Sequence, residues 1–305
     1  MKGKSKSIHP LVFLSQWRSL PCYELISYVL MFASMPMLAY GTKSYDMSIL
    51  RTIIFTILAL YSGFFATLIW NDITDADIDA IVHPDRPIPA GRINKKTYFA
   101  IALLFSLFTF IFSFLISFWC FMIVGATALF VAFHNKYLRR IIKLSAYSEI
   151  FTPLQWIIVP IFGFIAVNSS NYQDMLLLVV FTYFVDKAHD LPEGIHDKNG
   201  DQKYGISTYT TSFGERYAVK ISFALLLISG ILGIIIFFTT ILTFFFLIPF
   251  LVTWLYTLYY STKLIKAKKS ELKKLGIIVG RKNFDYFLFA YDFIFLDLLI
   301  QIFVL

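Results

Sequence analysis

The chain has 305 residues, of which 58% are hydrophobic and only 15% charged, and its mean hydropathy is +0.71. Because soluble domains carry about 25% charged residues, this composition excludes an ordinary soluble protein and predicts an integral membrane protein. The net charge of +8 has no soluble domain on which to form a nucleic-acid surface, so we expect no nucleic-acid partner and a basic rim against the lipid bilayer.

Apolar runs divide the chain into nine predicted transmembrane helices, each near the length of about 20 residues that a bilayer core requires. The run 98–133 is too long for one ordinary span, so we divide it into two short helices joined by a tight turn. We therefore expect an all-α membrane protein in which residues 1–305 form one domain, with nine helices around a central cavity. The predicted helices are 23–41, 48–70, 98–115, 117–133, 145–167, 172–187, 218–239, 241–261 and 284–304.

The basic residues predict how these helices are oriented. With nine helices, 25 of the 27 Lys and Arg residues fall on one side of the membrane, and only Lys43 and Arg51 fall on the other. Basic residues next to a span resist translocation, so the richer side is predicted to be cytoplasmic. The N-terminus and the connections after the even-numbered helices lie on this side, and the C-terminus is expected on the opposite side.

Two acidic clusters follow the second and the sixth predicted helices, on the predicted cytoplasmic side. Residues 72–85 and 186–201 hold ten of the nineteen Asp and Glu residues in thirty positions. Helical steps of three or four residues align several of these carboxylates on one face, and the two clusters are expected to face each other across the bundle. The aligned acids are Asp72, Asp75 and Asp79 in the first cluster, and Glu193, Asp197 and Asp201 in the second.

Carboxylates crowded in this way repel one another and take up protons unless a cation neutralises them. Mg²⁺ is the favoured ion, because it prefers oxygen ligands and completes its octahedron with waters and substrate phosphates. A phosphorylated ligand is therefore implied. Arg and Lys residues near the clusters would bind it, since guanidinium matches phosphate as a planar fork and ammonium acts as a point charge. The candidates are Arg86, Lys136, Arg139, Arg140 and Lys203.

The two clusters also resemble the signatures of a known family. Residues 71–79 read NDITDADID and are followed by DRPIPAG at 85–91, which resembles the first signature of the UbiA family of intramembrane prenyltransferases. Residues 197–208 read DKNGDQKYGIST and resemble the second signature, a DxxxD pair leading to a Gly and a Thr. The likeness extends over nearly the whole chain, because that family also has nine transmembrane helices with both signatures in cytoplasmic loops.

This resemblance implies roles for individual residues. Asn71, Asp72 and Asp75 would hold one Mg²⁺ and Asp197 with Asp201 another, and the two ions would grip the diphosphate of an isoprenoid donor. Asp79 and Asp190 match acidic positions that assist nearby. The segment 133–140 resembles the family's Tyr…Leu-Lys-Arg segment, with Arg139 in place of Lys and with Phe133 or His134 at the Tyr position.

The sequence thus predicts Mg²⁺-dependent transfer of a prenyl group from an isoprenyl diphosphate to a small aromatic or lipid acceptor, with the aromatic class favoured. Metal ions and basic residues would stabilise charge on the leaving diphosphate, and a cavity lined by aromatic rings would exclude water and stabilise the carbocation. A membrane terpene cyclase with the same metal site is the first alternative. A transporter that uses intramembrane acids is the second.

The remaining polar residues receive weaker predictions. Asp292 and Asp297 lie inside the last predicted helix, where a charge requires a polar partner, so they form structural hydrogen bonds or line the cavity. Glu193 receives no role. The two cysteines are far apart in the sequence and predict neither a disulfide nor a zinc site. Four histidines are expected to be loop residues that form no metal set, namely His83, His134, His189 and His196.

Overall fold

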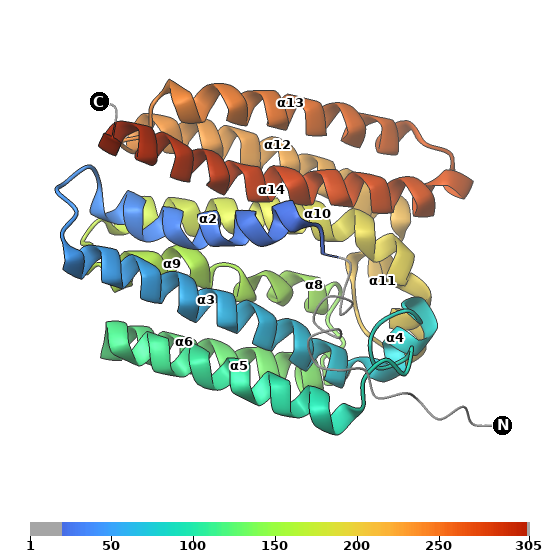
Figure 1. The fold of residues 1–305 in the computed structure, drawn as a ribbon. Helices are drawn as coiled ribbons and strands as arrows, with labels where there is room; N and C mark the ends of the chain where they lie inside the picture. Colours follow the sequence, from blue (N-terminus) through green and yellow to red (C-terminus); the bar gives the residue numbers. More distant parts are fainter. Residues whose placement is uncertain (1–19, 304–305) are drawn as a thin grey trace.

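The computed structural model describes residues 20–303, apart from the side chains of residues 153 and 154, and the regular elements of this part of the chain are all helical. The long helices lie side by side in one bundle (Figure 1). They are α2 (Cys22–Tyr40), α3 (Met47–Thr74), α5 (Lys95–Ile116), α6 (Phe118–Phe133), α10 (Tyr172–Tyr204), α12 (Glu215–Thr239), α13 (Phe244–Lys266) and α14 (Leu272–Phe303). The short elements are α4 (Ala76–Val82), η1 (His134–Leu138), α7 (Arg139–Ile141), α8 (Tyr147–Phe151), η2 (Thr152–Gln155), α9 (Ile158–Ala166), α11 (Tyr209–Phe213) and η3 (Lys269–Glu271).

Seven helices of the described chain are long and apolar enough to cross a membrane. The predicted count of nine is not confirmed, because the region 145–167 is divided among α8, η2 and α9, and the span 172–187 is only the first half of the charged helix α10. The division of 98–133 is confirmed. Ser117 breaks that run, and its side chain accepts a hydrogen bond from the backbone N–H of Cys120 to cap α6.

The core of the bundle lies around α2, α10 and α14. Helix α2 packs against α3, α9 and α14, while α10 packs against α12 and α14. Met31, Phe162 and Tyr291 are fully buried in this core. A Cβ on Gly163 would lie 2.5 Å from Cβ of Met35, so only glycine allows α9 to approach α2 this closely. The central cavity stays a prediction.

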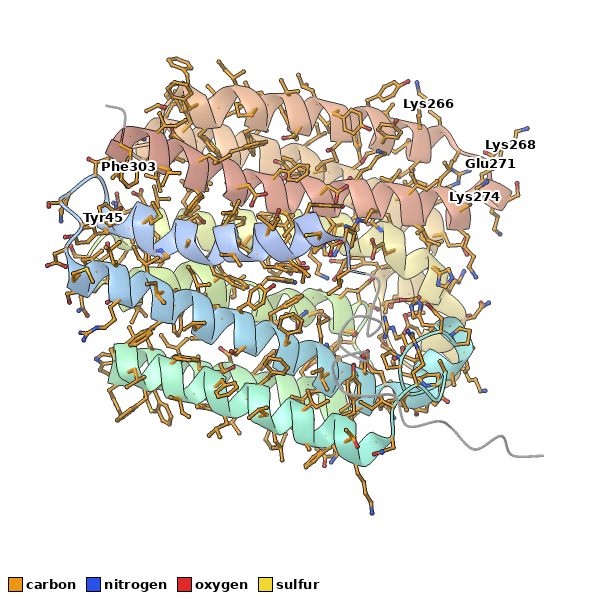
Figure 2. The ribbon with its side chains drawn as sticks, viewed as in Figure 1. Tyr45, Lys266, Lys268, Glu271, Lys274 and Phe303 are labelled. Atoms are coloured by element: carbon orange, nitrogen blue, oxygen red, sulfur yellow. The ribbon has the colours of Figure 1, made fainter. Side chains whose placement is uncertain are left out.

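The outward faces of the bundle are apolar, as a lipid-facing surface requires. Leu107 and Phe114 on α5, Phe238 on α12 and Tyr259 on α13 are each more than half exposed. Figure 2 shows such side chains along both flanks of the bundle. This surface is consistent with the predicted membrane location.

The two ends of the bundle differ in character. Tyr45 and Phe303 lie at one end, whereas Lys266, Lys268 and Lys274 lie at the other, which also carries α4 and α11 (Figures 1 and 2). The basic connection between α13 and α14 and the first acidic cluster therefore share one end, as the charge pattern predicts. The predicted cytoplasmic N-terminus lies outside the described residues, and the assignment of this end to the cytoplasm stays a prediction.

The expectation that the second acidic cluster lies in a loop was wrong. Helix α10 continues past residue 187 to Tyr204 although Pro192 lies inside it, and it ends at Gly205, whose φ of 67° is in the left-handed region. The expectation of loop histidines is wrong for three of the four. His189 and His196 lie within α10 and His134 begins η1, whereas His83 lies in the connection that follows α4.

Candidate metal and diphosphate site

The first acidic cluster lies where α3 ends and α4 begins. Asp72 is in the last turn of α3 and is only 1% exposed. The Tyr98 hydroxyl donates a 2.6 Å hydrogen bond to Oδ2 of Asp72. A short hydrogen bond of this kind to a carboxylate is charge-assisted and orients the acceptor. Tyr98 is positioned because Asn94 caps the start of α5, its side chain accepting from the N–H of Thr97 at 2.8 Å.

An amide pair and an ion pair connect this cluster to the segment that follows α6. Nδ2 of Asn135 donates to Oδ1 of Asn71 at 2.5 Å. The Arg139 guanidinium forms an ion pair with Asp75, and its Nε also donates to the backbone oxygen of Asn135 at 2.8 Å. Asn135 lies in the π-helical turn η1, and Arg139 is the residue after it. This turn therefore holds the Arg139 guanidinium beside Asp75.

Asp79 and Arg86 form the next pair along the chain. Nη1 of Arg86 lies 2.6 Å from Oδ1 of Asp79. The residue Asp79 is only 3% exposed. Burial raises the pKa of Asp79, and it raises that of Asp75 too, although the nearby arginines oppose the shift in both cases. Oδ2 of Asp79 is buried and makes no hydrogen bond within the described part of the chain. The first cluster thus contains a buried carboxylate oxygen to which no donor within the described residues forms a hydrogen bond.

The second cluster projects from α10 toward the first. Asp197 Oδ1 lies 3.0 Å from Nε2 of His83 and 3.0 Å from Nδ1 of His196. Burial favours a higher pKa for Asp197, but the hydrogen bonds and charges of the two imidazoles outweigh it and hold the pKa below its ordinary value. Asp201 lies one helical turn after Asp197. Its burial, and to a smaller extent the negative charge of Asp197, raise the pKa of Asp201 to about 7.

Close packing of α4 on α10 brings the two clusters together. Gly200 allows this approach, because a Cβ there would lie 2.9 Å from Cγ1 of Val82. The Tyr204 hydroxyl also donates to the backbone oxygen of Asp77 at 3.1 Å. Asp201 consequently lies close enough to Asp75 for the charge of Asp75 to contribute to the raised pKa of Asp201. Acids from two distant parts of the sequence therefore face one another.

A buried charged network adjoins the second cluster, and sequence reasoning missed it. Lys187 is 2% exposed and its Nζ donates to Oδ2 of Asp190 at 2.6 Å. Glu149, on α8, accepts a hydrogen bond from the backbone N–H of Tyr209 and so connects α8 to the start of α11. The sequence does contain a signal for this network, because Lys187 follows Asp186 at the end of an apolar run. Adjacent opposite charges in such a position predict a buried ion pair, since buried charges occur mainly where they are paired.

Other residues that the sequence singled out lie farther from the facing acids. Lys136 and Lys203 are exposed, and Lys136 lies over the ring of Tyr137 at 5.1 Å. Nη2 of Arg140 is 3.4 Å from Oδ1 of Asp77, at the edge of the first cluster. Glu193 packs against α14, where a Cβ on Gly280 would meet its Cγ.

Asp292 and Asp297, in the second half of α14, form structural hydrogen bonds. Ser27 on α2 donates to Oδ2 of Asp292 at 2.6 Å. The backbone N–H and the hydroxyl of Thr243, the residue before α13, both donate to Asp297, the former at 2.7 Å. Of the two roles that the sequence left open for these acids, these contacts match the structural one.

The facing acids suit a hard divalent cation. Their ligand atoms are carboxylate and amide oxygens, and two of their carboxylates are now neutralised by arginines. An anionic ligand that bound to these arginines would leave the acids free for the cation. The site can therefore hold a metal ion and a phosphorylated ligand together.

Comparison with known proteins identifies the family. A model of the UbiA prenyltransferase family matches residues 28–276. The digeranylgeranylglyceryl phosphate synthase of Saccharolobus solfataricus is 25% identical over 169 residues, which cover 55% of this chain and 59% of the relative. The first relatives are thus matched over less than two thirds of their own length.

Solved structures share the fold. The apo structure of a UbiA homologue from Aeropyrum pernix K1 superposes with a TM-score of 0.64 at 17% identity, covering 88% of this chain and 98% of that one. A UbiA homologue from Archaeoglobus fulgidus, bound to DMAPP and Mg²⁺, superposes with a TM-score of 0.57 at 12% identity, covering 87% and 96%. Because the family model extends over most of the sequence, the chain belongs to the UbiA prenyltransferase family.

Proposed function

We propose that this protein transfers a prenyl group from an isoprenyl diphosphate to an acceptor in the membrane, with Mg²⁺ as the required ion. The observation that carries the proposal is the meeting of acids from α3 and α4 with acids from α10, with Arg86 and Arg139 placed among them. The complex of the Archaeoglobus fulgidus homologue with DMAPP and Mg²⁺ supports both the donor class and the ion.

The residues fit the ion. Asp201 has its pKa raised to about 7 by burial and neighbouring carboxylates, and Asp79 keeps a buried oxygen without a hydrogen bond in the described structure. A divalent cation bound among these acids would offset the charge repulsion that contributes to the raised pKa of Asp201. We assign Asn71, Asp72 and Asp75 to one Mg²⁺ and Asp197 with Asp201 to a second. When bound, Mg²⁺ supplies charge stabilisation for the leaving diphosphate.

The cationic side chains of the site have a separate task in this proposal. Arg139 and Arg86 bind the diphosphate oxygens, since each already reaches an acid of the first cluster and carries a planar fork that suits phosphate. The diphosphate carries away the electron pair of the allylic C–O bond, and fixed positive charge lowers the barrier to this step. Positive charge at the rim of the site, which helps to bind the diphosphate, comes from Arg140, Lys136 and Lys203. Asp79 holds Arg86 in place, and Asp190 holds Lys187.

The acceptor then attacks the electrophilic carbon that forms, and the proton that the acceptor loses passes to water or to the released diphosphate. The name of the Saccharolobus solfataricus relative, digeranylgeranylglyceryl phosphate synthase, supports a glyceryl phosphate lipid as the acceptor. The aromatic acceptor favoured by the sequence stays a prediction.

The test is product analysis with purified protein in detergent. Labelled prenyl diphosphates of different lengths are incubated with Mg²⁺ and with either a prenylated glyceryl phosphate or a set of phenolic acceptors, and products are analysed by mass spectrometry. A product with the combined mass of acceptor and prenyl group supports the proposal and identifies the acceptor class. A cyclised terpene formed from donor alone would indicate a cyclase, and a donor left unchanged by every acceptor would contradict the enzyme assignment.

A further inference from the structure

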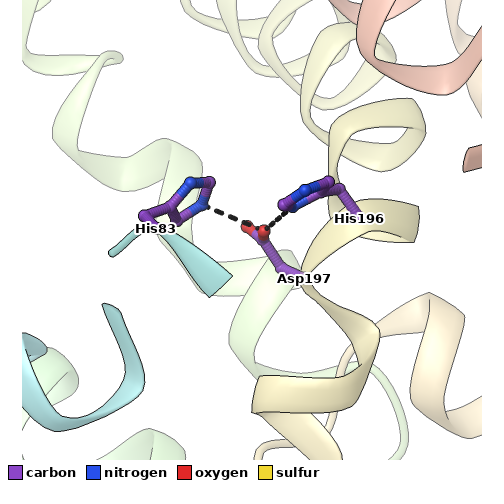
Figure 3. Close-up of side chains that lie close together, drawn as sticks. All are labelled: His83, His196 and Asp197. Carbon is purple, nitrogen blue, oxygen red and sulfur yellow. Dashed lines mark hydrogen bonds and ion pairs between the residues drawn. The ribbon is translucent and has the colours of Figure 1, made fainter. Parts of the chain in front are cut away.

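Two histidines converge on the carboxylate of Asp197, as Figure 3 shows. Nε2 of His83 and Nδ1 of His196 each lie 3.0 Å from Oδ1 of Asp197. One ligand atom from each of the three residues lies within 4.8 Å of the other two. The imidazole rings are nearly parallel, with their centroids 5.3 Å apart.

Two separate elements supply this cluster. His83 is the residue after α4, and its backbone is held on both sides, since its N–H donates to Asp79 O at 2.8 Å and its carbonyl accepts from the Arg86 N–H at 3.0 Å. His196 and Asp197 are consecutive residues of α10. The side chains of the cluster are between 26% and 37% exposed, so an ion can reach them from solvent.

The ligand chemistry differs from that of the facing acids. Two imidazole nitrogens and one carboxylate oxygen are typical ligands of Zn²⁺ and related transition ions, whereas Mg²⁺ prefers oxygen. Bonds of about 2.0–2.1 Å in a tetrahedral site place neighbouring ligand atoms roughly 3.3 Å apart. The two observed 3.0 Å separations are close to this spacing, and all three ligand atoms lie within 4.8 Å of one another. Side-chain rotations that adjust the distance between the two imidazoles would admit an ion, with water as the fourth ligand.

We propose that His83, His196 and Asp197 form a binding site for a divalent transition ion, with Zn²⁺ as the preferred occupant. An ion bound there takes Asp197 away from the Mg²⁺ position that the proposed function assigns to it. Zn²⁺ therefore inhibits prenyl transfer by competing for a shared ligand. The binding site stands on its own geometry, and only this inhibitory consequence rests on the proposed function.

Metal titration of the full chain in detergent, after treatment with a chelator, tests the site. Zn²⁺ binding is measured by competition with a fluorescent zinc indicator, and Co²⁺ is added separately to report coordination through its visible absorption. We expect one Zn²⁺ per chain and a Co²⁺ spectrum of a four- or five-coordinate site. Micromolar or tighter Zn²⁺ affinity supports the site, and binding no stronger than that of Mg²⁺ overturns it.

Conservative variants separate metal ligation from simple hydrogen bonding. His83→Asn and His196→Gln keep a polar side chain beside Asp197 but remove the imidazole, and each is expected to weaken Zn²⁺ binding at least tenfold. His189→Asn is the matched control, because His189 lies on the same helix outside the cluster, and its affinity should equal that of the unmodified protein. Zn²⁺ binding that persists unchanged in both His83→Asn and His196→Gln overturns the site.

A second measurement keeps this inference distinct from the proposed function. At fixed Mg²⁺, added Zn²⁺ should inhibit prenyl transfer by the unmodified protein, and each histidine variant should require at least tenfold more Zn²⁺ for the same fractional loss. Asp72→Asn, outside the cluster, should lose prenyl transfer and keep Zn²⁺ binding. If the unmodified protein bound Zn²⁺ but transferred no prenyl group to any acceptor, the result would contradict the proposed function while supporting the zinc site.

Discussion

Replacing Tyr98 with Phe removes a single hydroxyl from the deepest part of the candidate site. That hydroxyl donates a 2.6 Å hydrogen bond to Asp72, and the two residues are 0% and 1% exposed. The ring of Tyr98 stays in place as Phe, so the packing at the start of α5 is preserved. The substitution therefore tests how much the hydrogen bond contributes to holding the Asp72 carboxylate.

The expected magnitude follows from the charge and burial of this pair. A hydrogen bond to a charged group contributes about 1.5–3 kcal/mol, and each 1.4 kcal/mol corresponds to a factor of ten. If this energy serves to orient Asp72 for Mg²⁺, the affinity for Mg²⁺ should fall about 10- to 100-fold, the range typical of partners that orient metal ligands. The free energy of unfolding should fall by a similar energy.

The assay is the Mg²⁺ concentration that gives half-maximal prenyl transfer, measured beside chemical denaturation in detergent. Tyr286→Phe is the matched control, because it removes another buried tyrosine hydroxyl, 3.4 Å from Oγ of Ser229 and away from the acids. The control should keep the Mg²⁺ requirement of the unmodified protein. A Tyr98→Phe variant with that same unchanged requirement would refute the reasoning.

Three further predictions follow from individual contacts. Burial raises the pKa of Asp201 to about 7, so its carboxylate is lost as the pH falls through that value; the Mg²⁺ requirement should rise about tenfold between roughly pH 8 and pH 6, and a flat profile would contradict this. Arg139→Lys should lower activity about 10- to 100-fold at saturating Mg²⁺, because ammonium lacks the planar fork with which Arg139 is proposed to bind the diphosphate, and activity equal to that of the unmodified protein would count against it. Asp297→Ala should lower the free energy of unfolding by about 1.5–3 kcal/mol by leaving the donors of Thr243 unpaired, with unchanged activity per folded molecule, and a selective loss of activity would assign this acid to the site instead.

Local spacing was enough to find the facing acids. Asp72 with Asp75 and Asp197 with Asp201 are separated by three or four residues, and a helix places such positions on one face whatever the rest of the fold does. The charge bias of the connections likewise predicted that both clusters share one end of the bundle. These patterns depend on a few neighbouring residues or on composition, so they can be recognised in a single sequence without knowledge of the fold.

The partners of these acids could not be predicted in the same way. Tyr98 is 26 positions from Asp72, and Asn135 is 64 positions from Asn71, so only tertiary packing brings them together. The continuation of α10 to Tyr204 was missed because its second half is rich in charge and contains proline, which are features of a loop. Packing of α4 against this half, at Gly200 and through the hydroxyl of Tyr204, supports the helix.

The histidine cluster shows the same limit more sharply. His83 and His196 are far apart in sequence and match no metal motif, so the sequence predicted two loop residues. The approach of α4 to α10 at Gly200 places both rings at Asp197. The proposed metal site therefore becomes visible only in the folded chain, because its residues come from α10 and from the residue after α4.

The most direct test of the central claim is binding of a non-hydrolysable prenyl thiodiphosphate, because it measures the joint metal and diphosphate site without requiring the acceptor. Binding should require Mg²⁺ and should be abolished by Asp72→Ala in the first cluster and by Asp197→Ala in the second, with both variants folded. Binding that is independent of Mg²⁺, or that is unchanged in both variants, would contradict the claim that the two clusters form one site.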